Sequence, residues 1–191
     1  MKTSTTLTRQ QLETKWGNIV AASGYIFSWT ERCNLAYLAE MASGGKTVVE
    51  CGTYMGRSAK VMLGAGCGKI YCVDTFGVVG TYECCRYFMR EEIEKGRCEL
   101  LKMQSDEAGA LLADLGVQPD FIFVDDGHAY EDAIRDIKAL FPILKIGGTI
   151  CGHDYDAGSA VAKAVDELLP GRHLPVWRIW ALVKEAEAPW E

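Results

Sequence analysis

The sequence predicts an α/β domain in which helices cover both faces of a mostly parallel sheet. Two observations support this prediction. Short apolar, β-branched runs alternate with longer amphipathic stretches along the chain. In addition, two early apolar runs, about twenty residues apart, end in an acidic residue, at Glu50 and at Asp74. With 191 residues, 49% of them apolar and 24% charged, the chain has the composition of a single globular domain.

The apolar runs predict strands near residues 47–51, 69–73, 98–102, 120–124, 147–152 and 177–184. The amphipathic stretches between them predict helices near residues 31–43, 57–64, 83–95, 106–114, 130–141 and 158–169. Pro142 ends the helix at 130–141 because proline cannot continue a helix. Pro170-Gly171 predicts a turn, and a short strand between it and the last strand is left open. We expect one domain over residues 1–191, with residues 1–30 as an N-terminal cap.

The charge balance and the cysteines exclude several classes of protein. Twenty basic and twenty-six acidic residues give a net charge of −6, so we expect no nucleic-acid partner. No apolar run approaches the roughly 20 residues of a membrane span, and the first residues lack the apolar core of a signal peptide. We therefore expect no membrane partner and a cytoplasmic location. The eight cysteines form no C-x-x-C pair, which favours reduced side chains that pack in the core.

The run Thr47-Val-Val-Glu-Cys-Gly-Thr-Tyr-Met-Gly-Arg-Ser-Ala59 is typical of a loop that binds a nucleotide cofactor. Gly52 and Gly56 allow a sharp turn and a close approach of a ligand, and the helix that follows directs its N-terminus at the site. Asp74, at the tip of the next strand, is placed to accept hydrogen bonds from a ribose diol; the alternative is that it caps the following helix. The spacing is not G-x-G-x-x-G, which disfavours an NAD-dependent oxidoreductase.

Two later strands also end in titratable residues. Asp125 and Asp126 follow the strand at 120–124, then come Gly127 and His128, and the strand at 147–152 ends in His153 and Asp154. Neighbouring parallel strands lie about 4.8 Å apart, so Asp125 and Asp154 approach each other if these strands are neighbours. A divalent cation relieves the repulsion between two carboxylates, which favours Mg²⁺ or Mn²⁺. A histidine ligand shifts the preference toward Mn²⁺ or a later transition metal.

The run from Val48 to Ala59 resembles motif I of the class I S-adenosylmethionine-dependent methyltransferases. The segments Phe-Ile-Phe-Val-Asp-Asp-Gly-His-Ala-Tyr-Glu and Leu-Lys-Ile-Gly-Gly-Thr-Ile-Cys-Gly-His-Asp-Tyr resemble the small-molecule methyltransferases of type 24, which include relatives of macrolide sugar O-methyltransferases. The resemblance extends from about residue 24 to residue 185. It implies a Rossmann-like fold with a six- or seven-stranded sheet, S-adenosylmethionine over the first two strands, a small-molecule acceptor and, since relatives with short caps often pair, a homodimer.

The resemblance also implies roles for individual residues. We expect metal ligation by Asp125 and Asp154, with His153 as a third candidate where metal-dependent relatives often have a carboxylate. His128 matches the general base of sugar-methylating members and, with Asp125, is the catalytic candidate. Ser105 and Asp106 match an adenine-contacting turn, or else cap a helix. The expected cofactor contacts are Glu50, Gly52, Thr53, Tyr54, Gly56, Ser58, Asp74, Thr75, Phe76, Ser105, Asp106 and Asp125.

These residues predict metal-assisted O-methylation of a small hydroxylated molecule, in which His128 removes the hydroxyl proton. Two alternatives remain open. In the first, Asp125 and Asp154 bind a small amine without a metal, and the enzyme methylates nitrogen. In the second, the protein binds S-adenosylmethionine but catalyses no reaction. We expect the acceptor to contact the N-terminal cap and the loop Gly77-Val-Val-Gly-Thr-Tyr82, since loops carry specificity.

Overall fold

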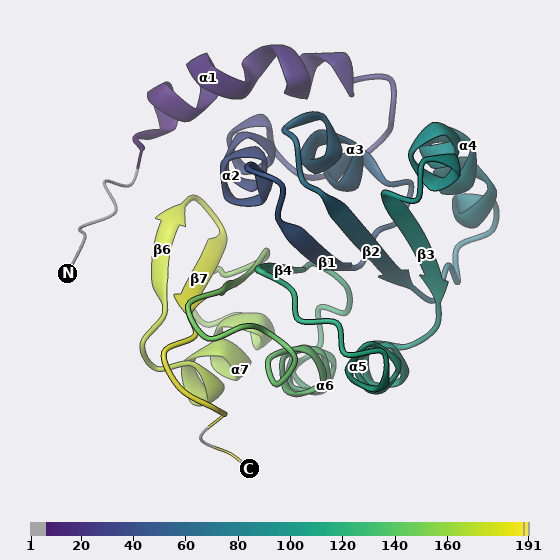
Figure 1. The fold of residues 1–191 in the computed structure, drawn as a ribbon. Coiled ribbons are helices and arrows are strands. Elements are labelled where there is room, and N and C mark those ends of the chain that lie inside the picture. Colours follow the sequence, from purple (N-terminus) through teal and green to yellow (C-terminus); the bar gives the residue numbers. More distant parts are fainter. Residues whose placement is uncertain (1–6, 189, 191) are drawn as a thin grey trace.

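A twisted seven-stranded sheet forms the centre of the structure, a computed structural model that describes residues 7–188 and 190 (Figure 1). The strand order is β3-β2-β1-β4-β5-β7-β6. The strands are β1 (Thr47–Cys51), β2 (Lys69–Asp74), β3 (Cys98–Lys102), β4 (Phe121–Val124), β5 (Thr149–Gly152), β6 (His173–Val176) and β7 (Ile179–Val183). The first five pair in parallel, whereas β7 is antiparallel to both β5 and β6. The sequence left undecided whether a short strand precedes the last one, and the structure has such a strand, β6.

Helices cover both faces of the sheet, as Figure 1 shows. Helices α2 (Arg32–Ala42), α3 (Arg57–Gly64) and α4 (Thr81–Glu94) lie on one face. Helices α5 (Ser105–Asp114), α6 (Tyr130–Leu140) and α7 (Ala160–Leu168) lie on the other. Helix α1 (Arg9–Ala22) packs outside the first layer, against α2 and α3. The predicted α/β class, mostly parallel sheet and Rossmann-like arrangement are confirmed.

Two apolar cores, one on each face, hold these layers together. Val48 and Phe121 pack in the core beneath α2 and α3, whereas their neighbours Val49 and Ile122 pack in the core beneath α5 and α6. Successive strand residues point to opposite faces of a sheet, so a strand that is covered twice is apolar at most positions, with Glu50 of β1 as an exception. This explains why the central strands appear in the sequence as continuous apolar runs.

The N-terminal segment, expected only as a cap, contains the helix α1. Thr8 caps it: the backbone N–H of Gln11 donates to Thr8 Oγ1 (3.3 Å), and the backbone N–H of Thr8 donates to Gln11 Oε1 (2.8 Å). This reciprocal pair satisfies two backbone donors at the helix start. Leu12 and Val20 are buried on the face of α1 that meets the rest of the protein.

All eight cysteines are free and all except Cys84 are buried, which agrees with the prediction that they are reduced side chains packed in the core. Within residues 7–188, no helix is both long enough and apolar enough to cross a membrane.

Candidate functional site

A cavity of about 500 Å³ opens at the carboxyl ends of the parallel strands. Its walls are the loops that follow β1 and β2, the ends of β4 and β5, the segment before α2, and Arg178 from the turn between β6 and β7. Ligands of open α/β sheets bind at this edge. Ten residues expected to function line it: Gly52, Thr53, Tyr54, Ser58, Asp74, Thr75, Asp125, His128, His153 and Asp154.

Gly52 is required by the approach of two backbone segments. Its φ of 89° lies in the left-handed region, and a Cβ on this residue would lie 2.0 Å from the carbonyl oxygen of Asp125. No side chain fits there, so glycine lets the loop after β1 contact the end of β4. Gly56 is the N-cap of α3 with a φ of 86°, and a Cβ there would meet the Met89 side chain at 2.8 Å. Gly56 thus faces α4 and lies outside the cavity wall.

Asp74 joins the two loops that would hold a cofactor. Its Oδ2 accepts a hydrogen bond from the Tyr54 amide (2.7 Å), and its Oδ1 accepts one from the Phe76 amide (2.5 Å). Helix α4 begins later, with Gly80 as its N-cap. The alternative that Asp74 caps this helix is therefore wrong. Each carboxylate oxygen keeps a lone pair for a further donor.

Glu50 is completely buried beneath the glycine loop. Neither of its carboxylate oxygens has a hydrogen-bond partner among the described residues. Burial raises the pKa of Glu50 to about 8, and the charges of Asp125 and Asp74 act in the same direction. The nearby hydroxyls of Ser58 and Thr53 oppose this rise, although no hydrogen bond of ordinary geometry joins them to the carboxylate. Glu50 therefore lies behind the cavity wall as an acid without a partner.

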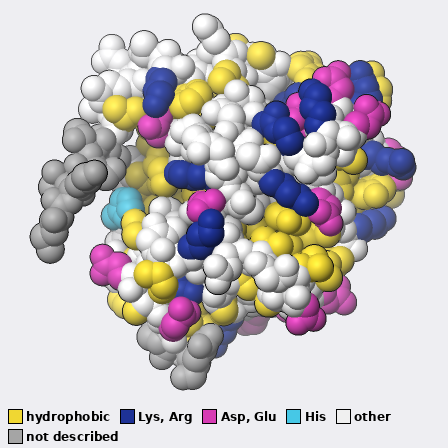
Figure 2. All heavy atoms as spheres, in the orientation of Figure 1, with side chains coloured by type: hydrophobic (Ala, Val, Ile, Leu, Met, Phe, Trp, Pro, Cys, Tyr) yellow, Lys and Arg dark blue, Asp and Glu magenta, His cyan; other side chains and the backbone are white. Residues whose placement is uncertain are grey.

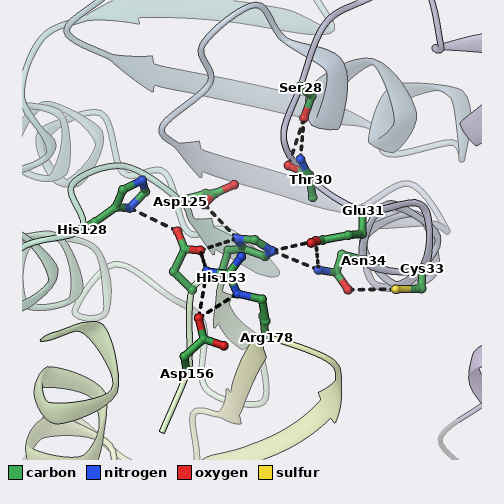
Figure 3. A network of polar contacts seen from close by, with 11 residues as sticks. Ser28, Thr30, Glu31, Cys33, Asn34, Asp125, His128, His153, Asp156 and Arg178 are labelled. Atoms are coloured by element: carbon green, nitrogen blue, oxygen red, sulfur yellow. Dashed lines mark hydrogen bonds and ion pairs between the residues drawn. The ribbon is translucent and has the colours of Figure 1, made fainter. Parts of the chain in front are cut away.

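Asp125, His153 and Asp154 come together because β4 and β5 are parallel neighbours, with Val124 opposite Gly152. One ligand atom from each of the three lies within 4.8 Å of the others. The Nδ1 atom of His153 lies 3.1 Å from Asp154 Oδ1 and 3.6 Å from Asp125 Oδ1 (Figure 3). Two carboxylates and an imidazole nitrogen at these separations are a suitable donor set for a divalent cation of mixed oxygen and nitrogen preference.

The electrostatics of this group differ from residue to residue. Burial raises the pKa of Asp125 to about 7; the positive charge of His153 opposes the rise and the charge of Asp154 adds to it. The hydrogen bond with His153 lowers the pKa of Asp154 against the effect of its own burial. Burial alone would lower the pKa of His153, but the surrounding carboxylates, Asp154 first, outweigh it and raise the pKa.

Glu31 and Asn34 complete the surroundings of His153, and sequence reasoning missed both. The His153 Nε2 atom lies 3.2 Å from Glu31 Oε2 and 3.0 Å from Asn34 Nδ2 (Figure 3). The side-chain amide of Asn34 also donates, through Nδ2, to Glu31 Oε2 (3.0 Å). Glu31 is the N-cap residue of α2, but its side chain makes no capping bond. These contacts span 119 and 122 residues, and no local pattern in the sequence indicates them.

Arg178 is a third site residue that the sequence did not indicate. It occupies the turn between β6 and β7 with a φ of 61°, a conformation uncommon outside glycine. Its guanidinium lies 2.5 Å from Asp154 Oδ1 and 2.9 Å from Asp156 Oδ2. A cation that binds Asp154 Oδ1 has to compete with this guanidinium. The only feature of the sequence that could have indicated this contact is a basic residue directly after Trp177.

His128 precedes α6 with an exposed side chain that points toward Asp154 (Figure 3). Its Nδ1 atom lies 3.1 Å from Asp154 Oδ2. A carboxylate only accepts hydrogen bonds, so Nδ1 carries the proton, and in the neutral imidazole Nε2 keeps a lone pair. Asp154 thus orients His128 with one oxygen while the other faces His153 and Arg178.

Five residues expected at the cofactor lie outside the cavity wall: Glu50, Gly56, Phe76, Ser105 and Asp106. Phe76 is buried against Tyr82, with ring centroids 5.1 Å apart. Ser105 is buried on α5 and donates to Asp136 Oδ1 (2.5 Å). Asp106 is exposed on the same helix.

The alternative that Ser105 and Asp106 cap α5 is wrong. The cap is Gln104, which forms a capping box with Glu107. The Gln104 amide donates to Glu107 Oε2 (3.2 Å). Glutamine is not among the usual N-cap residues, whereas serine and aspartate are, so the sequence favoured Ser105 and Asp106 as the cap of this helix.

The mouth of the cavity carries an aromatic cluster of Phe27, Trp29 and Tyr54. The ring centroids of Phe27 and Trp29 are 4.9 Å apart, and those of Trp29 and Tyr54 are 5.1 Å apart. Gly77, Val78 and Thr81 line another part of the wall. Both segments expected to contact the acceptor therefore border the cavity.

Comparison with known proteins agrees with this geometry. The family model of a methyltransferase domain, type 24, matches residues 49–155, which include every strand end of the cavity wall from β1 to β5. A search of curated proteins finds no match.

Several solved structures share the fold. A Podospora anserina methyltransferase with bound S-adenosylhomocysteine (SAH) is 15% identical, with a TM-score of 0.67, and the match covers 93% of each chain. An O-methyltransferase from Bacillus cereus, also with SAH, is 13% identical over 91% of this chain and 90% of that one, with a TM-score of 0.66. An rRNA methylase from Streptococcus thermophilus is 15% identical over 84% of this chain and 100% of that one, with a TM-score of 0.60. Other matched structures are longer: the chain spans 39% of a Streptococcus mutans methyltransferase and 52% of TrmN from Thermus thermophilus.

Proposed function

The chain belongs to the type 24 family of methyltransferase domains. On that premise we propose that it is an S-adenosylmethionine-dependent enzyme that methylates a hydroxyl oxygen of a small molecule with the help of a divalent cation. The observation that carries the proposal is the pair His128 and Asp154, with 3.1 Å between Nδ1 and Oδ2 at the edge of the cavity. A histidine held by a carboxylate is the usual arrangement of a general base.

His128 would remove the proton of the acceptor hydroxyl. Asp154 holds Nδ1–H, which leaves the Nε2 lone pair for the proton of the acceptor. The sulfonium of S-adenosylmethionine is already a good electrophile, so the remaining tasks of the protein are to align the oxygen and to remove its proton.

The cofactor would lie along the loops after β1 and β2. Asp74, held by two backbone amides, can accept hydrogen bonds from ribose hydroxyls. Thr53, Ser58 and Thr75 line the same part of the cavity. In its ionised form, Glu50, buried close behind the loop, would attract the positive charge of the cofactor through space.

Asp125, His153 and Asp154 would hold the cation, and the close spacing of their ligand atoms supports this assignment. When bound, Mg²⁺ or Mn²⁺ would lower the pKa of the acceptor hydroxyl and fix its position. Arg178 would have to release Asp154 Oδ1, and Asp156 Oδ2 offers it an alternative partner.

A small acceptor is favoured over RNA by charge. The net charge is −6, and four aspartates line the cavity, Asp74, Asp125, Asp126 and Asp154. Figure 2 shows acidic and basic side chains interspersed on the face that it draws, without a continuous basic surface. A phosphate backbone requires several unpaired basic groups along its path.

The deciding experiment is a calorimetric titration with S-adenosylmethionine, with and without Mn²⁺ or Mg²⁺, followed by methyl-transfer assays on small alcohols, small amines and RNA. We expect cofactor binding, and transfer to an alcohol that EDTA suppresses. Transfer that persists in EDTA would replace the metal-assisted mechanism, and transfer to amines or RNA alone would overturn O-methylation of a small molecule.

A further inference from the structure

We propose that the acceptor is a phenol, a planar aromatic ring with a hydroxyl group, held against Phe27, Trp29 and Tyr54 with its hydroxyl toward His128. This inference rests on the proposed function and adds the chemical class of the acceptor. The aromatic cluster and His128 border one cavity, which also contains the loop that would hold the cofactor.

The aromatic cluster contributes little to the core. Trp29 is 72% exposed and Phe27 is 55% exposed. Large aromatic side chains bury roughly 150–250 Å² each when they are packed, so an exposed group of them forgoes a large stabilisation. Contiguous exposed apolar surface at the mouth of a cavity marks a place where a ligand completes the packing.

The cluster is also connected to the site through the backbone. Tyr54 has a φ of 51°, and its backbone amide donates to Asp74, so the glycine loop fixes the position of its backbone beside the site. Trp29 lies in a turn that Ser28 closes: the Thr30 amide donates to Ser28 Oγ (3.0 Å) (Figure 3). Two residues after Trp29, Glu31 contacts His153. One segment thus carries both an aromatic surface and a contact to the polar group.

The rings present faces in several directions. The Phe27 and Trp29 rings are inclined by 84°, and the Trp29 and Tyr54 rings by 43°. Aromatic pairs favour offset or edge-to-face contacts, so a flat ring can meet one of these rings by its face and another by its edge. A saturated ring lacks the quadrupole on which this preference depends.

Acceptor acidity favours the same class. A phenol ionises near pKa ~10, whereas an alcohol close to water in acidity ionises near ~15.7, so the proton of a phenol is far easier to remove. In the transfer, the O–H bond of the phenol breaks and its proton passes to His128 Nε2. The phenol oxygen forms a bond to the methyl carbon, and the carbon–sulfur bond breaks with its electron pair remaining on sulfur. The products are an aryl methyl ether, S-adenosylhomocysteine and a proton that His128 releases to water.

The test compares 2-naphthol with its saturated counterpart decahydro-2-naphthol. Calorimetry measures the binding of each to protein saturated with S-adenosylhomocysteine, which has no methyl group to transfer. We expect 2-naphthol to bind roughly 2- to 12-fold more tightly, the range for an aromatic pair beyond its buried area. Trp29→Ala should abolish this preference. Tyr87→Ala should keep it, because Tyr87 is 62% exposed on α4 and lies outside the cavity wall.

Equal binding of the two alcohols, absence of 2-naphthol binding, or a preference that survives in folded Trp29→Ala would overturn the inference. A second assay separates it from the proposed function. Methyl transfer to decahydro-2-naphthol without transfer to 2-naphthol would leave O-methylation standing and remove the phenol. A Trp29-dependent preference for 2-naphthol, with no methyl ether formed from any hydroxyl, would remove O-methylation and leave the aromatic binding surface.

Discussion

The carboxylate of Asp154 holds the imidazole of His128, with 3.1 Å between Oδ2 and Nδ1, while its Oδ1 atom faces His153 Nδ1 at the same distance. One side chain therefore connects the exposed histidine of the site with the buried one. The φ of 60° at Asp154, unusual for a residue other than glycine, directs the side chain between them.

Replacement of His128 tests the general base. A positioned base contributes roughly 10²–10⁴ in rate, so His128→Ala should lower kcat by a factor in that range. Cofactor affinity and melting temperature should change little, because the side chain is exposed. The measurements are kcat, cofactor affinity and Tm on the same variant. Full kcat in a folded variant would eliminate the base, and a parallel loss of stability and cofactor binding would indicate a structural role.

Asp74→Ala tests the ribose contact. The substitution should weaken S-adenosylmethionine binding by about 1–3 kcal/mol, the range for a lost partner of a buried hydrogen-bonding group. Isothermal titration measures the affinity, and the melting temperature checks that the loops remain folded without the acceptor for Tyr54 and Phe76. The matched control is Asp114→Ala, an exposed acid at the end of α5 that should leave affinity unchanged. Equal affinities for both variants would contradict the assignment.

Arg178→Gln tests the competition for Asp154. Removal of the guanidinium frees Asp154 Oδ1, so Mn²⁺ should bind more tightly, by roughly ten-fold on the scale of a charged hydrogen bond. Titration monitored by Mn²⁺ electron paramagnetic resonance measures the free ion directly and requires no catalysis. Arg172→Gln is the control, since Arg172 pairs with Asp166 away from the site. Unchanged or weaker Mn²⁺ binding in Arg178→Gln alone would show that the ion does not use this oxygen.

Glu50→Gln tests the buried acid through pH. The pKa of Glu50 is raised to about 8 in the folded protein, above its ordinary value of 4.5 when unfolded. Between these values the folded state binds the extra proton, so the stability due to this group is present at low pH and is lost as pH rises toward and through 8.

The cofactor-free wild-type protein should therefore lose more Tm between pH 5 and pH 8 than Glu50→Gln, because glutamine does not ionise. Thermal melts at several pH values measure the difference. Glu83→Gln, an exposed acid in the first turn of α4, should behave as the wild type. Identical pH profiles for wild type and Glu50→Gln would refute the raised pKa. Weaker cofactor binding by Glu50→Gln would separately support the electrostatic role.

Much of the fold could be predicted because its signals are local. Val48 and Val49 point to opposite faces, so a strand covered on both sides has an unbroken apolar run that is visible in the sequence. The acids and histidines directly after such runs had to lie at the carboxyl edge of a parallel sheet. This is why the sequence alone indicates Asp74, Asp125 and Asp154 as candidate site residues.

Other features depended on segments that meet only in the folded chain. Gly52 is glycine because the carbonyl of Asp125 lies where a Cβ would be, an approach across 73 residues that no spacing rule contains. Ser105 has the position of a cofactor contact along the chain, yet its hydroxyl points to Asp136.

The sequence by itself determined the strands and helices other than α1 and β6, the glycine loop and the titratable residues at the strand ends, since each depends on neighbours a few positions away. Only the tertiary structure decided which side chains surround them. The N-terminus of α2 brings Glu31 to His153, and the turn after β6 brings Arg178 to Asp154. These contacts depend on how distant loops fold over one edge of the sheet, and packing of whole layers, rather than any local pattern, sets that arrangement.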